Sequence, residues 1–464
     1  MQVEFYGASD GDVTGSCHIL RFGSYTVLFD CGMIQGGRKA VERNREPFPF
    51  DPASIDAVIL SHAHIDHSGR LPLLVKQGFN KQIHTQNATV DLCDVLLKDS
   101  AKLSQYDAER YNKKHPDEPR REPLFTDEDV QTCLSYFVGH RYSQSFEALP
   151  GLMITFQDAG HILGSAMIEA EISENGMTKK VVFSGDIGQF NTPILQDPTL
   201  IDYADLVIME STYGGRLHRE RDLTIDEIGE VIQSAHANKG NILIPAFSIG
   251  RSQEILYHFV EHFDEWQLHN WQIYLDSPMA IEASKIYWEF KHLHDKAARR
   301  LLGEFGDKIP LPNYQRTVTA DESRQLNEIP SGAIFIAGSG MCNGGRIMHH
   351  LRHNLHRQAC HVMIVGYQAN GTLGRRLVNG EKEVKMFGQW IPVNAHIHTV
   401  GGLSAHADQK DLLRWLKGFT NNPHVCLVHG ERDSQDAFIN YASKATNLTI
   451  THPDSSDIVD LAVL

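Results

Sequence analysis

Residues 58–72 read Val-Ile-Leu-Ser-His-Ala-His-Ile-Asp-His-Ser-Gly-Arg-Leu-Pro, and they give the strongest indication of the fold. The apolar segment at 57–60 predicts a strand that runs into a short loop. The loop carries four candidate metal ligands, which are His62, His64, Asp66 and His67. In extended backbone, side chains two positions apart point the same way and adjacent side chains point apart. The spacing therefore favours two neighbouring ions over one, and imidazole with carboxylate suits zinc or a similar divalent metal.

A plainer interpretation treats these side chains as ordinary polar loop residues, because the chain contains 26 His among 464 residues. A lone pair of His would carry little weight in such a chain. A packed His-x-His-x-Asp-His run directly after an apolar strand is much harder to explain without a ligand. We therefore expect a metal site at this loop.

Length and composition describe a globular chain with more than one core. A chain of 464 residues exceeds what one core usually holds, and 41% hydrophobic with 22% charged residues is typical of a globular protein. The seven Cys are dispersed and odd in number, which is typical of reduced thiols. No N-terminal signal pattern and no apolar run of membrane length is visible, so we expect a cytoplasmic protein with no membrane partner.

The formal net charge is −15, which disfavours a nucleic-acid partner because phosphate binding needs positive charge. Bound metal ions offset part of this charge locally, and a basic groove can lie on an acidic body. The charge therefore lowers the expectation of nucleic-acid binding without excluding it.

Together with two later segments, the metal loop resembles the metallo-β-lactamase superfamily, whose fold is an αββα sandwich with a metal site at one edge. The superfamily motif is H-x-H-x-D-H, as at residues 62–67. Residues 158–165, Asp-Ala-Gly-His-Ile-Leu-Gly-Ser, resemble its third ligand motif, with His161 as the ligand. The predicted strand at 181–185 runs to Asp186, which matches the carboxylate that bridges both metals in this superfamily.

Asp30 follows a predicted strand and precedes Cys31 and Gly32. Alone, such an Asp is best explained as an ordinary turn residue. The superfamily carries an Asp at this place, so the resemblance implies that Asp30 hydrogen-bonds a ligand His and sets its tautomer.

Three further segments resemble motifs A, B and C of the β-CASP group, which comprises RNA-processing nucleases of this superfamily such as the polyadenylation cleavage endonuclease and its bacterial and archaeal relatives. They are residues 205–214 with Glu210, residues 403–408 with His406, and residues 424–431 with His429. In that group a second domain is inserted into the lactamase domain. The resemblance implies a lactamase domain at 1–212 and 391–464 and an inserted β-CASP domain at 213–390.

The inserted region repeats a strand, a Gly-rich loop and a helix, at 241–251, 333–346 and 361–375. Such units predict a parallel sheet, so the fold class is α/β throughout. Loops of this kind can present backbone N–H groups to phosphates. The candidate RNA-binding residues are Arg251, Ser339, Arg346, Arg375 and Ser404. The alternative is that the loop glycines only allow tight turns and that the basic segment 346–357 is a solvated helix face.

Residues 81–150 are charged and are predicted to be helical. Within them, the polar run 107–121 contains Pro116 and Pro119 and indicates a solvated loop.

The resemblance implies two Zn²⁺ per chain, with Asp186 bridging them. One ion would be bound by His62, His64 and His161, and the other by Asp66, His67 and His429. Such a pair supplies a nucleophile from water and stabilises charge on a phosphodiester. His406 would protonate the leaving oxygen and Glu210 would orient His406. The expected reaction is endonucleolytic hydrolysis of single-stranded RNA that leaves 5′-phosphate and 3′-hydroxyl ends.

Several alternatives remain. The chain could be a 5′-to-3′ exoribonuclease, a thioester or lactam hydrolase of the same superfamily, or a non-catalytic RNA scaffold. DNA is a further substrate, but a His at the motif C position goes with RNA in the β-CASP group, so His429 favours RNA. The resemblance also suggests a homodimer.

Overall fold

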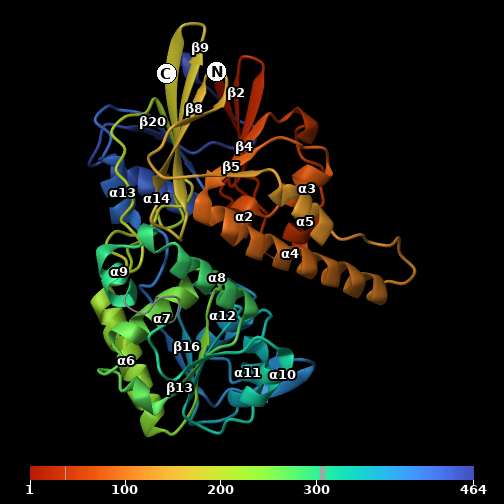
Figure 1. Cartoon of the computed structure of the whole chain (residues 1–464), viewed down its shortest axis with the longest axis vertical. Helices are drawn as coiled ribbons and strands as arrows, with labels where there is room; N and C mark the ends of the chain where they lie inside the picture. Colours follow the sequence, from red (N-terminus) through yellow and green to blue (C-terminus); the bar gives the residue numbers. More distant parts are fainter. Residues whose placement is uncertain (37, 304–308) are drawn as a thin grey trace. The chain divides into compact units, whose positions relative to one another are not determined.

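The computed structural model describes residues 1–36, 38–303 and 309–464, and it divides into two compact units (Figure 1). Unit 1 comprises Met1–Thr192, Gln196–Leu217 and His406–Leu464. Unit 2 comprises Pro193–Leu195 and His218–Ala405. The chain thus passes between the units near 217 and 405, whereas the sequence-based boundaries lie at 212 and 390.

Unit 1 contains two β-sheets. The first has the strand order β22 (Ile458–Asp460), β1 (Gln2–Gly7), β2 (Cys17–Phe22), β3 (Tyr25–Phe29), β4 (Ala57–Ile59), β5 (Ile83–Gln86) and β6 (Phe137–His140). The second has the order β21 (Thr449–Thr451), β20 (His424–Val428), β11 (Leu206–Glu210), β10 (Met177–Phe183), β9 (Ala166–Glu174), β8 (Leu152–Asp158) and β7 (Phe146–Leu149).

The two sheets share one hydrophobic core, to which both contribute alternating side chains. Phe29 of the first sheet stacks on Phe183 of the second, with ring centroids 5.7 Å apart. The helices of unit 1 are α1 (Arg38–Arg43), η1 (Pro52–Ser54), α2 (Ile65–Ser68), α3 (Leu71–Lys76), α4 (Asn87–Lys114), α5 (Asp127–Leu134), α13 (Gln409–Leu416), α14 (Arg432–Ala442) and η4 (Leu461–Val463). A separate core cluster joins α13 and α14 to the second sheet, while α4 contacts β5 and β6 of the first. The predicted αββα sandwich is confirmed.

The expectation for residues 81–150 was wrong in two respects. The strands β5, β6 and β7 lie within this range, and α4 runs on to Lys114 instead of ending before the polar run. The helix ends at Lys114, with His115 as its C-cap, because Pro116 follows and the residue before a proline avoids helical dihedral angles. Polarity alone does not end a helix, since Lys, Glu and Arg are good helix formers.

Unit 2 is built on a parallel sheet, as predicted. Its strand order is β14 (Tyr314–Arg316), β13 (Gln272–Leu275), β15 (Ala333–Ala337), β12 (Ile242–Pro245), β16 (His361–Ile364) and β19 (His396–Thr399). Each neighbouring pair of these strands is parallel. An antiparallel hairpin is formed by β17 (Glu383–Met386) and β18 (Gln389–Pro392). Because β19 pairs with β16, residues 396–399 belong to this sheet.

Helices cover both faces of this sheet, which explains why its central strands are continuous apolar runs. They are α6 (Arg221–Ala237), α7 (Arg251–Glu261), η2 (Leu268–Asn270), α8 (Pro278–Glu289), η3 (Lys291–Leu293), α9 (Lys296–Gly303), α10 (Ala320–Leu326), α11 (Ile347–Asn354) and α12 (Leu373–Val378). On β12, Ile242 and Ile244 pack in the cluster with α6, α7 and α8. The intervening Leu243 packs in the cluster with α10, α11 and α12.

All seven Cys are buried free thiols in this fold. In the part of the chain that the structure describes, no helix has both the length and the apolarity that a membrane crossing needs.

A buried carboxylate, Asp276, follows β13 and ties several elements of unit 2 together. It accepts hydrogen bonds from the Ser323 hydroxyl (2.6 Å) and from His350 Nε2 (2.7 Å), and it pairs with the Arg346 guanidinium (2.7 Å). Thr317 donates a further hydrogen bond of 2.5 Å. Asp276 therefore joins the end of β13 to α10 and α11.

We expect Asp276→Ala to destabilise unit 2 strongly, because it leaves the half-buried Arg346 guanidinium and several buried donors without their acceptor. Removing one partner of a buried ion pair typically costs about 3–5 kcal/mol. Urea unfolding of the full-length protein measures this change. Asp321→Ala is the control, since Asp321 and Arg324 form an exposed pair, and its effect should be small. Equal effects of the two substitutions would contradict the proposed importance of Asp276.

The same carboxylate predicts a dependence of stability on pH. Burial alone would raise the pKa of Asp276, but hydrogen bonds from His350, Ser323 and Thr317 lower it below the ordinary value of 3.8. Its contribution is therefore complete above that value and is lost as the pH falls through the lower pKa of the folded state. The difference in unfolding free energy between wild type and Asp276→Asn should shrink on acidification below pH 3.8. A constant difference would show that the carboxylate charge is unimportant.

Candidate metal centre

The candidate ligands come from strand ends of both sheets of unit 1. Asp30 follows β3, and the segment with residues 62–67 follows β4, which is parallel to β3. Asp66 and His67, which were expected in a loop, lie on the short helix α2. In the other sheet, β10, β11 and β20 are parallel neighbours. They lead to Asp186, Glu210 and His429, respectively. Since parallel strands place their carboxyl ends at one edge, these side chains converge there, as in other α/β sites.

The first ligand group consists of His62, His64, His161 and Asp186. His64 Nδ1 lies 3.2 Å from His62 Nε2 and 3.2 Å from His161 Nε2. The Asp186 Oδ2 atom lies 3.4 Å from His62 Nε2 and 3.5 Å from His161 Nε2. The resemblance implied the same set for one ion, with three His as its ligands and Asp186 as the bridge to the other ion.

The second group consists of Asp66, His67 and His429. His429 Nε2 lies 3.1 Å from His67 Nε2 and 3.6 Å from Asp66 Oδ2. The other oxygen of Asp186, Oδ1, lies 3.2 Å from His67 Nε2. Asp186 thus turns one carboxylate oxygen toward each group.

The donor set and its spacing fit metal ions. Ligands placed tetrahedrally around zinc at about 2.0–2.1 Å lie roughly 3.3–3.4 Å from one another. The donor atoms described above are separated by 3.1–3.6 Å. Asp186 Oδ1 is buried and accepts no hydrogen bond from the described residues, which is costly unless a cation satisfies it.

The imidazoles of the first group are held neutral, as metal ligands must be. Burial lowers the pKa of His64 to about 3, and the neighbouring His62 adds to the effect. Burial, with His406 nearby, also holds the pKa of His161 well below its ordinary value. Both rings therefore present nitrogen lone pairs at neutral pH.

The second group carries a strong negative potential. Burial would raise the pKa of Asp186, but the imidazoles of His429 and His67 hold it well below its ordinary value. Burial would lower the pKa of His67, but the carboxylates of Asp186 and Asp30 raise it well above its ordinary value. Carboxylates that attract a proton so strongly to this imidazole would equally attract a metal cation.

Asp30 lies behind the metal ligands and orients His67. It is fully buried, and its Oδ2 atom lies 2.7 Å from His67 Nδ1. Because Asp30 engages the Nδ1 atom, Nε2 is the His67 nitrogen that faces Asp186 and His429 and the one that a metal ion would use. Asp30 also accepts hydrogen bonds from the backbone N–H (2.8 Å) and hydroxyl (2.9 Å) of Ser61.

Two hydroxyl residues in the site were missed by the sequence analysis. Ser61 Oγ lies 3.1 Å from His62 Nδ1, and Thr212 Oγ1 lies 3.1 Å from His429 Nδ1. Each hydroxyl contacts the Nδ1 atom of a His, so the Nε2 atom of that imidazole faces the ligand group. The available signal was position, since Ser61 directly precedes His62 and Thr212 lies two residues after Glu210.

His406 and Glu210 form a pair beside the first group. His406 Nδ1 lies 3.1 Å from Glu210 Oε1, and Glu210 is fully buried. Burial would lower the pKa of His406, but the carboxylates of Glu210 and Asp186 raise it to about 10. The backbone N–H of Ile187 also donates to Glu210 (2.7 Å), which fixes the carboxylate. The predicted partnership of His406 with Glu210 is therefore present as a contact.

The five candidate RNA-binding residues all lie in unit 2, whereas the two ligand groups belong to unit 1. Arg346 pairs with Asp276 and donates to the carbonyl groups of Thr317 and Val318. Arg251 is 9% exposed and pairs with Glu254. The other three are on α12 or in loops, namely Arg375, Ser339 and Ser404. Their role in RNA binding stays a prediction.

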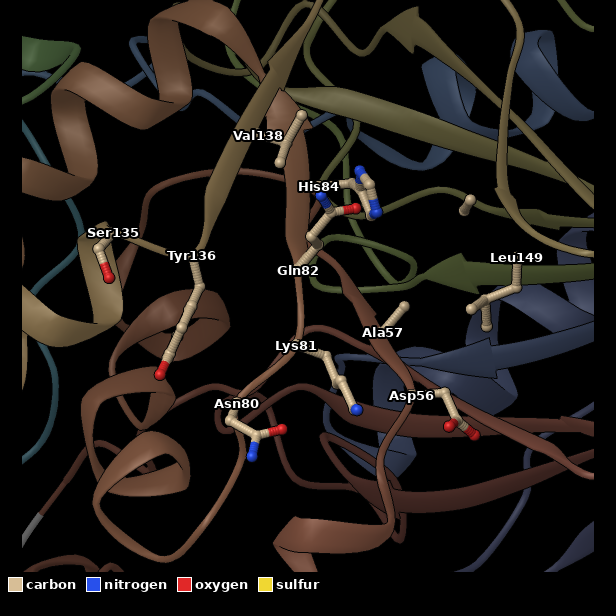
Figure 2. Close-up of a pocket in the computed structure, with 11 residues that line it drawn as sticks. Asp56, Ala57, Asn80, Lys81, Gln82, His84, Ser135, Tyr136, Val138 and Leu149 are labelled. Atoms are coloured by element: carbon tan, nitrogen blue, oxygen red, sulfur yellow. The ribbon is translucent and has the colours of Figure 1, made fainter.

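A separate cavity of about 460 Å³ lies elsewhere in unit 1 (Figure 2). Its lining includes Asp56, Ala57 and Lys81, which lie at the starts of β4 and β5. The metal loop leaves the opposite end of β4, so this cavity is not part of the metal centre.

A close backbone contact positions the metal loop. The Asp66 carbonyl accepts a hydrogen bond of 2.9 Å from the Ser16 backbone N–H. A Cβ atom at Gly32 would lie 1.6 Å from that carbonyl oxygen. Only glycine therefore lets the backbone after β3 pass against the loop that carries Asp66 and His67.

We expect Gly32→Ala to lower the metal content of the purified protein, because the added methyl group must displace the Asp66 backbone. Metal analysis by mass spectrometry, with circular dichroism to confirm folding, measures the effect. Gly344→Ala is the matched control, since a Cβ at Gly344 meets nothing within 4 Å. A folded Gly32→Ala protein with full metal content would contradict this account of the loop.

Comparison with known proteins agrees with this arrangement. Three family models match the chain: the metallo-beta-lactamase superfamily at residues 10–142, the Beta-Casp domain at 252–377, and the Zn-dependent metallo-hydrolase RNA specificity domain at 390–453. The chain is similar to a crystal structure of a protein of unknown function from Enterococcus faecalis V583, with a TM-score of 0.56, 13% identity and 99% of each chain covered.

Curated relatives match over most of the chain. Ribonuclease TTHA0252 of Thermus thermophilus is 37% identical over 433 residues, which cover 93% of this chain and 94% of that protein. Transcription termination factor FttA of Methanocaldococcus jannaschii is 29% identical, covering 93% of this chain and 67% of that protein. The chain therefore belongs to the β-CASP group of metal-dependent RNA nucleases within the metallo-β-lactamase superfamily.

Proposed function

We propose that this chain is a zinc-dependent ribonuclease that cleaves single-stranded RNA within the strand. The observation that carries the proposal is Asp186, whose two oxygens face two separate imidazole groups. The proposal is supported by the relative named as a ribonuclease, which matches over nearly its whole length. Paired metal sites about 3.5–4 Å apart stabilise both the attacking and the leaving oxygen when a phosphodiester is hydrolysed.

The proposed ligands are those of the two groups. His62, His64 and His161 would hold one zinc ion, and Asp66, His67 and His429 would hold the other. Asp186 would bridge the two. Bound there, zinc ions would supply Lewis acidity and lower the pKa of water toward neutrality.

His406 is proposed as the general acid. Its Nδ1 atom lies 3.1 Å from Glu210 Oε1, so Nε2 is the ring nitrogen to which we assign proton donation to a substrate. The raised pKa of about 10 keeps the ring protonated at neutral pH. Donation of this proton to the 3′-oxygen as it leaves would give 3′-hydroxyl and 5′-phosphate ends. Glu210 is the residue that orients and charge-pairs His406.

A thioester or lactam hydrolase is a weaker candidate, because unit 2 and the His406–Glu210 pair have no role in such a reaction. A 5′-to-3′ exoribonuclease would use the same centre and differs only in where the RNA end is held. A homodimer and a cytoplasmic location stay predictions.

The proposal is tested with RNA labelled at either end and with zinc analysis of the same samples. Wild type should release internal fragments. Asp186→Asn should lose both zinc and activity. His406→Ala should keep its zinc but lose activity by about 10²–10⁴-fold, which is the usual contribution of a general acid. His115→Ala, on the surface of unit 1, is the control and should behave as wild type.

The outcomes separate the candidates. Mononucleotides released from the 5′ end would replace endonucleolytic cleavage with the exonuclease alternative. Cleavage of a matched single-stranded DNA alone would overturn the RNA assignment. A zinc-loaded wild type that cuts neither substrate would overturn the nuclease proposal itself.

A further inference from the structure

Unit 2 contains another group of side chains that could hold a metal ion, at the carboxyl-terminal end of α7. It consists of His258, Glu261 and His262, which form a His-x-x-Glu-His sequence. Residues three and four apart on a helix share one face. In this structure the candidate ligand atoms of all three residues lie within 4.8 Å of one another. The cluster is therefore a local arrangement that the helix itself creates.

Glu261 lies between the two imidazoles. Its Oε2 atom is 3.2 Å from His258 Nδ1 and 3.4 Å from His262 Nε2. These separations match those between donor atoms in the centre of unit 1. One cation could therefore contact a carboxylate oxygen and two imidazole nitrogens without a large rearrangement.

The His262 ring is held in an orientation suited to a ligand. Its Nδ1 atom lies 2.8 Å from Glu265 Oε2, so the Nδ1 proton is donated to that carboxylate. The ring also stacks on Trp266, with centroids 4.6 Å apart and an interplanar angle of 16°. Metal-bound His residues usually donate their second ring N–H to a carboxylate in this way. The Nε2 lone pair of His262 is thereby left facing Glu261.

Burial and charge also favour a cation at this place. His258 is 3% exposed, which fixes one ligand against the core of unit 2. The Glu261 side chain is 41% exposed, so an ion can enter from solvent and water can complete its coordination. The carbonyl groups at the end of a helix carry a partial negative charge that attracts cations.

We propose that His258, Glu261 and His262 form an additional divalent-metal site that accepts zinc or another imidazole-binding ion and stabilises the end of α7. The site is separate from the proposed catalytic pair, because all three ligands belong to unit 2. Imidazole with carboxylate ligation favours zinc, copper or nickel over calcium. The competing explanation is a helix face linked only by hydrogen bonds and ion pairs, which needs no metal.

The test counts zinc ions in the full-length protein after metal removal and reloading with zinc. His262→Ala and Glu261→Gln change partly exposed side chains, so both variants should fold. Each should hold one zinc ion fewer per chain than wild type and should keep the wild-type nuclease activity. The matched control is His353→Ala. His349 and His353 are also one turn apart, on α11, but within the described residues they belong to no such three-ligand group.

Thermal unfolding gives a second readout. Zinc should raise the midpoint of wild type more than that of His262→Ala, because ligand binding to the folded state stabilises it. Calcium should not reproduce the difference, since it prefers ligand sets made only of oxygen. Equal zinc content in wild type and both variants would overturn the proposal. An equal loss of zinc in His353→Ala, or equal stabilisation by calcium, would also overturn it.

Discussion

The structure of unit 1 depends on placing a buried carboxylate, Asp186, between two groups of imidazoles. An ionised carboxylate is costly to bury unless positive charge or hydrogen bonds compensate it. Here the compensation comes from residues on both sheets, so the sandwich must close before the site exists. The need to hold Asp186, His67 and His429 together therefore couples the metal centre to the fold.

The strand arrangement explains how residues far apart in sequence meet. Parallel neighbours in each sheet have their carboxyl ends at the same edge, so the residues that follow these strands come together there. Around the ligands, a further set of residues restricts the imidazoles. Asp30 and Thr212 each engage the Nδ1 atom of a ring, and Ser61 does so for His62. The geometry of the donors thus rests on partners that bind no metal themselves.

Imidazole and carboxylate side chains come together in two different ways in this protein. In unit 1, the imidazole and carboxylate groups are assembled from many strand ends. At the end of α7, a similar combination lies within the five residues 258–262, and Glu265 contacts His262 Nδ1 as Asp30 contacts His67 Nδ1. Local spacing can make a cation site, but only the assembled centre presents two ligand groups that share one carboxylate.

The candidate ligands could be named from the sequence because they lie in short motifs at or near the ends of apolar strands. The contact between Glu210 and His406 was implied by the resemblance to motifs A and B, and the structure contains it. The carboxyl-terminal end of α4 was not predictable in this way, because polarity does not end a helix. Nor was the sheet to which β19 belongs, because strand pairing is a long-range contact.

From the sequence alone, the motifs and their resemblance to a known superfamily predicted the αββα sandwich, and the strand–loop–helix units predicted the parallel sheet of unit 2. They also named the candidate ligands, whose individual roles in metal binding stay predictions. The folded structure was needed to show which imidazole nitrogens face the site, that Gly32 lies against Asp66, and that Arg346 is bound to Asp276. Residue type and spacing are local properties of the chain, whereas the direction of a side chain and the partners of a buried charge depend on residues that are tens to hundreds of positions away in the sequence.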